Sequence, residues 1–202
     1  MGHPPTAAEL TRRLAEHHRV MVLGGLAVIG HGQSRSTYDS DLWLDPTLPL
    51  QDWCEAIHGL SMVPGPVSVV CMGSWREIGP EEIAGVIQRD RVVRISGASQ
   101  PIDIFREPNE LDMGLFDEVW GRARPLGDGT RLPDAIDLLA TKQMTGRDKD
   151  LADITFLERK AEADYLARLP GASASEALAM LARFLTPRVA EAALDHADAS
   201  VS

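Results

Sequence analysis

Hydrophobic residues recur with two different periods along this chain, and the period changes near Pro108. Before that point, short apolar runs such as residues 20–23 (VMVL) and 67–72 (VSVVCM) alternate with helical patterns, which predicts strands between helices. Residues 91–95 (RVVRI) and 101–105 (PIDIF) flank a loop that contains glycine, and they predict a hairpin. The spacing favours a mixed sheet in the front half of the chain.

Helical signals precede, separate and follow these strands. Thr6 is followed three residues later by Glu9, a capping box that predicts the start of a helix. After residue 108 the apolar spacing is helical throughout. We therefore expect an α+β protein with a small mixed twisted sheet flanked by helices in residues 1–108, and a helical C-terminal region, packed on that core, in residues 109–202.

Composition and charge narrow the class of protein. The 202 residues are 44% hydrophobic and 25% charged, the balance of a globular domain, and no run approaches the ~18 apolar residues of a membrane span. We expect a cytoplasmic protein without a membrane partner. The net charge of −10 disfavours binding to long nucleic acids. Two arginine clusters, RDRVVRI and GRARP, are interpreted as solvated strand edges and a turn, with a local basic patch as the alternative.

Paired carboxylates stand out in the DSDLWLD stretch. Strand alternation directs Leu42 and Leu44 into the core, so Asp39 and Asp41 project together from the opposite face. The same alternation in PIDIF places Asp103 outward. If the two strands are neighbours, three carboxylates converge.

Three converging carboxylates suit Mg²⁺, a hard cation that takes oxygen ligands, and two such ions would serve phosphoryl chemistry. Gly24 and Gly25 follow the first strand, where a turn without Cβ atoms lets the backbone approach phosphate oxygens. A lone DxD has a simpler interpretation, in which one aspartate caps the strand and the other faces solvent. The combination with the glycine pair and Asp103 favours the metal site.

These residues carry a resemblance to a known family. The stretch GGLAVIGHGQSRSTYDSDLWLD resembles the signature of the DNA polymerase β-like nucleotidyltransferase superfamily. Its GG form is similar to bacterial minimal nucleotidyltransferases, including AbiEii-type toxins and antibiotic adenylyltransferases, although many members have Gly-Ser in the turn. Two later stretches, FDEVWGRARPL and LPDAIDLLATKQMTGRDKDLADI, resemble the helical part of the same proteins. The resemblance extends over residues 20–157 and implies the nucleotidyltransferase fold, with the catalytic core in residues 1–108.

The resemblance also implies roles for individual residues. It implies that three carboxylates bind the metal and carry the catalysis, and that one of them, Asp103, is also a candidate general base. It also implies that residues of the glycine turn, the polar loop and a later helix contact the nucleoside triphosphate, such as ATP. The metal-binding and catalytic residues are Asp39, Asp41 and Asp103, and the nucleotide-binding residues are Gly24, Gly25, Arg35, Thr37 and Lys142.

A helical wheel over residues 136–157 gives Lys142 a second basis. At about 100° per residue, Lys142, Lys149 and Asp153 fall on one stripe opposite the apolar sector, which predicts an exposed face. Arg147 falls near the apolar sector, and we expect Asp150 to pair with it. Asp150 and Asp153 are also alternative candidates for a carboxylate that positions the acceptor.

Two further residues have open interpretations. Trp43 shares the carboxylate face, where it would either stack on a base or pack in the core, and His31 is interpreted as a helix-end residue.

The sequence supports three hypotheses about function. The first is a Mg²⁺-dependent nucleotidyltransferase that moves an NMP from an NTP to a hydroxyl of a tRNA end, a small molecule or a protein, and that acts as the toxin of a toxin–antitoxin pair with an antitoxin partner. The second is a catalytically silent nucleotide-binding or toxin–antitoxin interaction module. The third is an α/β domain whose acids bind a structural cation.

Overall fold

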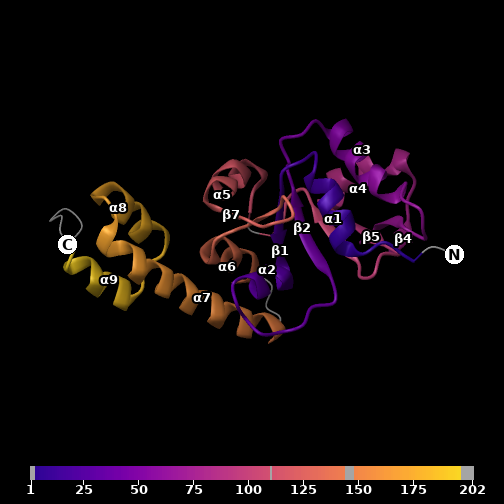
Figure 1. Cartoon of the computed structure of the whole chain (residues 1–202). Helices are drawn as coiled ribbons and strands as arrows, with labels where there is room; N and C mark the ends of the chain where they lie inside the picture. Colours follow the sequence, from indigo (N-terminus) through magenta and orange to yellow (C-terminus); the bar gives the residue numbers. More distant parts are fainter. Residues whose placement is uncertain (1–2, 110, 144–147, 197–202) are drawn as a thin grey trace. The chain divides into compact units, whose positions relative to one another are not determined.

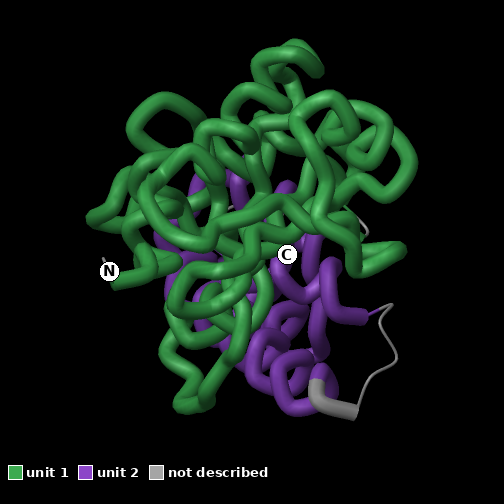
Figure 2. Tube along the Cα trace, turned by 90° about the vertical axis from the view of Figure 1, so that its right-hand side faces the viewer, with its two compact units in different colours: residues 1–134 green, residues 135–202 purple. Residues whose placement is uncertain are grey.

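The chain forms two compact units, which are coloured separately in Figure 2. The first is Met1–Asp134 and the second is Ala135–Ser202. Residues 109–134, which the apolar spacing grouped with the helical region, thus belong to the first unit. The computed structural model describes residues 3–109, 111–143 and 148–196.

An eight-stranded mixed sheet forms the centre of the first unit (Figure 1). Its strands are β1 (Val20–Leu23), β2 (Ser40–Leu44), β3 (Ser68–Cys71), β4 (Arg76–Glu77), β5 (Val92–Ser96), β6 (Ile102–Phe105), β7 (Arg124–Pro125) and β8 (Arg131–Leu132). The order is β4-β3-β5-β6-β2-β1-β8-β7, with β2–β6 and β1–β8 parallel and the other pairs antiparallel. The α+β class is confirmed, but the sheet is larger than expected.

The extra strands β4, β7 and β8 contain two residues each. A segment of two residues is too short to show an alternating pattern, so the apolar spacing did not indicate these strands. The strands β7 and β8 extend the sheet beyond β1 with residues that lie after Pro108. This extension is why the first unit reaches Asp134.

Alternation along the central strands separates the two faces of the sheet, as predicted. Leu42 and Leu44 are 1% and 0% exposed, and Ile102 and Ile104 are 1% and 0% exposed. The hairpin predicted from RVVRI and PIDIF is confirmed, since β5 and β6 are antiparallel neighbours with Val93 opposite Ile104. One face of the central sheet is therefore apolar, and the other carries Asp41 and Asp103.

The helices of the first unit are α1 (Ala7–Ala15), α2 (Gly24–Gly30), α3 (Leu50–Ser61), α4 (Pro80–Asp90) and α5 (Phe116–Arg122), with a short 3₁₀ helix, η1 (Met113–Leu115), before α5. The predicted capping box at the start of α1 is confirmed, since Thr6 Oγ1 accepts from Glu9 N–H and the Glu9 carboxylate accepts from Thr6 N–H. Helices α1, α3 and α4 lie together (Figure 1), and α3 contacts β3 while α4 contacts β5.

The second unit is helical in its described residues. It consists of α6 (Ala135–Gln143), α7 (Asp148–Arg168), η2 (Leu169–Gly171), α8 (Ala174–Arg183) and α9 (Pro187–Leu194). Its hydrophobic core is a cluster of buried side chains from α7, η2, α8 and α9. The members of this cluster are Tyr165, Leu169, Ala177, Met180, Val189 and Ala193.

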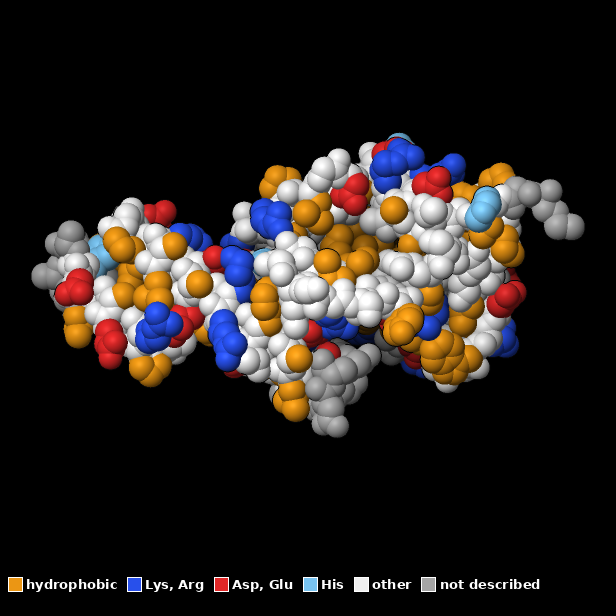
Figure 3. Space-filling view, turned by 60° about the horizontal axis from the view of Figure 1, so that its bottom comes forward, with side chains coloured by type: hydrophobic (Ala, Val, Ile, Leu, Met, Phe, Trp, Pro, Cys, Tyr) orange, Lys and Arg blue, Asp and Glu red, His pale blue; other side chains and the backbone are white. Residues whose placement is uncertain are grey.

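Two further findings concern the distribution of charge on the surface and the length of the apolar helices. On the face drawn in Figure 3, Lys and Arg side chains are interspersed with acidic and hydrophobic ones rather than gathered in one basic area. None of the helices in the described residues is both long enough and apolar enough to cross a membrane.

Candidate functional site

The first candidate residue, Gly24, lies in close contact with the carboxylate of Asp41. β1 ends at Leu23, which is paired with Asp41 of β2, and α2 begins at the next residue. Gly24 has a φ of +57°, in the left-handed region, and a Cβ atom built there would lie 1.7 Å from Asp41 Oδ2. Only glycine fits this position, because any other side chain would be strained and would displace the carboxylate.

Gly25 makes a similar close approach to the polar loop. A Cβ atom at Gly25 would lie 2.7 Å from Thr37 Oγ1 and 3.4 Å from Arg35 Nη2. The Thr37 hydroxyl is in turn 3.2 Å from Asp39 Oδ1, to which it donates. The structure therefore brings Gly25, Arg35, Thr37 and Asp39 together. The nucleotide-binding roles of Gly25, Arg35 and Thr37 and the metal-binding role of Asp39 stay predictions.

Asp103 lies directly beside Asp41. β6 is the parallel neighbour of β2, and the register places Asp41 opposite Asp103. The two carboxylate strands are therefore neighbours, which is the condition that the sequence pattern left open. On its other side β6 pairs with β5, where Asp103 lies opposite Arg94. Arg94 donates two hydrogen bonds to Asp103, from Nε to Oδ1 at 2.6 Å and from Nη2 to Oδ2 at 2.7 Å.

The guanidinium of Arg94 also faces the other carboxylates. Its Nη2 atom lies 3.9 Å from Asp39 Oδ2. Hydrogen bonding to Asp103 raises the pKa of Arg94, and the negative charges of Asp39 and Asp41 act in the same direction against the effect of burial. The ring of Trp75 lies over the guanidinium, with its centroid 5.1 Å from Arg94 Cζ. Arg94 therefore supplies positive charge to this cluster.

The arrangement bears on metal binding in two ways. Three carboxylate side chains are a suitable donor set for Mg²⁺, and Asp39, whose side chain is 39% exposed, leaves one side open to solvent. Within residues 3–109, 111–143 and 148–196, however, no three His, Cys, Asp or Glu side chains lie as a group that could hold a metal ion. Arg94, which donates to Asp103 and lies 3.9 Å from Asp39, occupies the space beside these carboxylates.

Lys142 lies in the second unit and is buried, at 6% exposure. Its Nζ atom lies 2.9 Å from Asp153 Oδ2 and 3.2 Å from Asp150 Oδ1. The prediction of an exposed stripe is wrong for Lys142 and Asp153. The wheel treated residues 136–157 as one helix, whereas α6 ends at Gln143 and α7 begins at Asp148, and the two pack on each other.

Other expectations about this helical pair have different outcomes. Arg147 and the side chain of Lys149 lie outside the described residues, so the pair expected between Arg147 and Asp150 is not described. Among the described residues, Asp150 contacts Lys142. The role of Lys142 in phosphate binding stays a prediction.

The two open interpretations are now decided. Trp43 is 0% exposed, donates from Nε1 to the carbonyl of Arg106 at 3.1 Å, and packs edge-on against Phe116 with ring centroids 5.0 Å apart. It belongs to the core, where its ring packs instead of being exposed for stacking on a base. His31 ends α2 as expected, and its Nε2 atom lies 2.9 Å from the carbonyl oxygen of Pro133.

The arginine clusters behave as expected with one exception. Arg89 and Arg91 are exposed and lie near Asp90 and Glu107. Arg94, interpreted as a solvated strand residue, is instead only 17% exposed in its side chain. The predicted hairpin could have indicated that Arg94 pairs with Asp103, because the register that pairs Val93 with Ile104 also places Arg94 opposite Asp103. Trp75, in the turn between β3 and β4, had no such signal.

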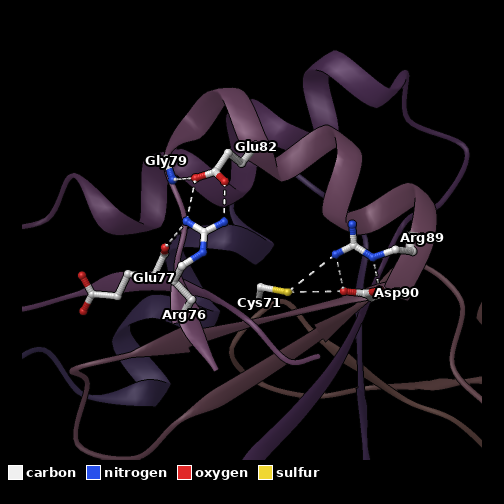
Figure 4. A network of polar contacts seen from close by, with 7 residues as sticks. All are labelled: Cys71, Arg76, Glu77, Gly79, Glu82, Arg89 and Asp90. Carbon is white, nitrogen blue, oxygen red and sulfur yellow. Dashed lines mark hydrogen bonds and ion pairs between the residues drawn. The ribbon is translucent and has the colours of Figure 1, made fainter. Parts of the chain in front are cut away.

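Two pockets lie away from the candidate carboxylates. One, of about 460 Å³, is lined by residues of β3, β4 and α4, and its charged side chains form the network of Figure 4. There Arg76 pairs with Glu82 and lowers its pKa to about 2, and Arg89 pairs with Asp90. The other, of about 440 Å³, lies between α1 and α3. Neither pocket is lined by a candidate residue.

The chain matches no protein-family model and no curated protein sequence.

Proposed function

We propose that the first unit is the core of a Mg²⁺-dependent nucleotidyltransferase with the nucleotidyltransferase fold. The observation that supports this best is the position of Asp41 opposite Asp103 on neighbouring parallel strands, with Gly24 packed against the Asp41 carboxylate. Asp39 adds a third carboxylate, which lies 3.9 Å from the guanidinium of Arg94. The resemblance of residues 24–45 to the superfamily signature points to the same chemistry.

The reaction transfers an NMP from an NTP to a hydroxyl group. The acceptor oxygen forms a bond to the α-phosphorus, the bond from that phosphorus to the bridging oxygen breaks, and pyrophosphate leaves with the bonding electrons. Asp39, Asp41 and Asp103 would hold Mg²⁺, which supplies positive charge to the phosphate oxygens when bound. A carboxylate of this set, with Asp103 as the candidate, accepts the proton that the hydroxyl loses.

The acceptor is proposed only as a chemical class. The net charge of −10 and the mixed surface of Figure 3 favour a small molecule, a protein side chain or a short tRNA end over a long duplex. A toxin that modifies such an acceptor and is restrained by an antitoxin fits the same chemistry.

A label-transfer assay tests this proposal. The protein is incubated with Mg²⁺, each of the four NTPs labelled at the α-phosphate, and total RNA, candidate small acceptors or protein extract. We expect transfer by the wild type, a reduction of about 100-fold or more in Asp41→Asn, and no reduction in Asp52→Asn, an exposed aspartate of α3. Transfer that survives in Asp41→Asn would contradict the site assignment.

One observation favours the alternative of a nucleotide-binding or antitoxin-binding module without turnover. Both carboxylate oxygens of Asp103 accept from Arg94, which keeps this residue from acting as a base while the pair persists. Nucleotide binding by wild type without transfer to any acceptor would favour this module over the enzyme.

A further inference from the structure

The counter-ion at the three carboxylates leads to an inference that rests on the proposed function. We propose that Arg94 is a built-in counter-cation that neutralises Asp103 and Asp39 until a divalent metal ion replaces it. Arg94 is then a positioning residue, because it acts through the carboxylates. Arg94 makes two hydrogen bonds to Asp103, approaches Asp39 and lies against the ring of Trp75.

Electrostatics require a cation at this place. The Asp103 side chain is 7% exposed, and Asp41 and Asp39 add negative charge on the same face of the sheet. Carboxylates so close together repel, and a buried charge without a partner is strongly destabilising. Arg94 removes this penalty when no metal ion is bound, because its fork of donors matches both oxygens of Asp103.

The same electrostatics make the two cations competitors. A divalent ion bound by Asp103 would lie within a few ångströms of the guanidinium, where like charges repel in an environment partly shielded from water. The metal ion must therefore displace the guanidinium from Asp103. Trp75 contacts the guanidinium independently of the carboxylates, so a contact remains for Arg94 after this exchange.

Other arginine–carboxylate pairs in the first unit provide a matched control. The Arg89 side chain is 64% exposed and pairs with Asp90 at the end of α4 (Figure 4). Removing its charge changes the net charge of the protein as much as removing that of Arg94, but it leaves the three carboxylates unchanged. Arg89→Met therefore separates a local exchange from a general effect of charge.

The test measures Mn²⁺ binding without nucleotide, through the loss of the free Mn²⁺ signal in electron paramagnetic resonance. Mn²⁺ is the probe because it accepts the same oxygen ligands as Mg²⁺. We expect Arg94→Met to bind Mn²⁺ about tenfold more tightly than wild type, and Arg94→Lys, which keeps the charge but not the fork, to fall between them. Arg89→Met should match wild type.

Stability provides a second measurement if Arg94→Met is poorly folded. Because a metal ion stabilises the state that binds it, Mn²⁺ should raise the melting temperature of Arg94→Met and Arg94→Lys more than that of wild type. The proposed exchange of Arg94 for a metal ion would be overturned by one result. In that result, the Arg94 variants bind Mn²⁺ no more tightly than wild type, and Mn²⁺ raises their melting temperatures no more than that of wild type.

The two proposals fail in distinguishable ways. If wild type binds Mn²⁺ and transfers nucleotides, but Arg94→Met binds Mn²⁺ only as tightly as wild type, the counter-ion exchange is contradicted and the proposed function is not. Failure of every variant and of wild type to bind Mn²⁺ would remove the exchange and the metal site of the proposed function together.

Discussion

Each of the two units places aspartates near a buried or half-buried basic side chain, but the two clusters differ in access to solvent. In the second unit, the side chains of Lys142, Asp150 and Asp153 are 8%, 3% and 2% exposed. In the first unit, Arg94 is 17% exposed and Asp39 is 39% exposed. A closed cluster stabilises a helix pair, whereas an open cluster leaves carboxylates within reach of a cation from solvent.

The largest effect on stability is expected at the closed cluster. Lys142→Met leaves two buried aspartates without this partner and should reduce the free energy of unfolding by about 3–5 kcal/mol. Urea denaturation followed by circular dichroism measures this loss. Lys160→Met is the matched control, because Lys160 pairs with Asp164 on the surface of α7 and such a pair contributes about 0.5 kcal/mol. Equal losses in the two variants would contradict the distinction between the clusters.

The next effect concerns the glycine turn at the open cluster. Gly24→Ala combines left-handed strain with a collision against Asp41, and we expect a loss of about 2–4 kcal/mol in unfolding free energy and a loss of Mn²⁺ binding. Gly32→Ala shares the positive φ, +105°, but has no atom within 4 Å of the added Cβ. It should lose about 1–2 kcal/mol and keep Mn²⁺ binding. Unchanged binding in Gly24→Ala would show that Asp41 is not held in place by this contact.

A smaller effect tests how Asp39 is held. Thr37→Val removes the hydrogen bond from Thr37 Oγ1 to Asp39 and should cost about 1 kcal/mol, with Mn²⁺ affinity reduced about fivefold at most. Thr47→Val removes a similar bond to Asp45, a buried carboxylate that accepts from Arg19. It should cost about as much stability without a change in Mn²⁺ affinity. Equal affinities in the two variants would argue against a role for Asp39 in metal binding.

The smallest effect on stability is expected at an exposed ion pair, that of Arg76 and Glu82. The hydrogen bond from Arg76 lowers the pKa of Glu82 from 4.5 to about 2. A lowered carboxyl pKa stabilises the fold above the ordinary pKa, and this contribution disappears as the pH falls towards the folded value. Melting temperatures of wild type and Glu82→Gln, measured from about pH 6 to about pH 2.5, should therefore differ slightly at the upper end and converge at the lower end. A difference that grows as the pH falls would contradict this cause.

Much of the site follows from local patterns. The glycine pair after β1 and the alternation in DSDLWLD and PIDIF are properties of a few consecutive residues, and they predicted which side chains face the core and which face away. Because backbone geometry sets the period of a strand, Leu42, Asp41 and Asp103 lie on the faces that the sequence indicated. The capping box of α1 is equally local.

The remaining features depend on parts of the chain that are distant in sequence. Alternation gives a face but not a neighbour, so only the sheet order showed that Asp41 lies opposite Asp103, and only the side-chain contacts showed Arg94 between Asp103 and Asp39. Lys142 is the opposite case. A helical wheel measures the angle around one axis and contains no information about the helix packed beside it, so the sequence predicted an exposed lysine where the tertiary structure buries it between two aspartates.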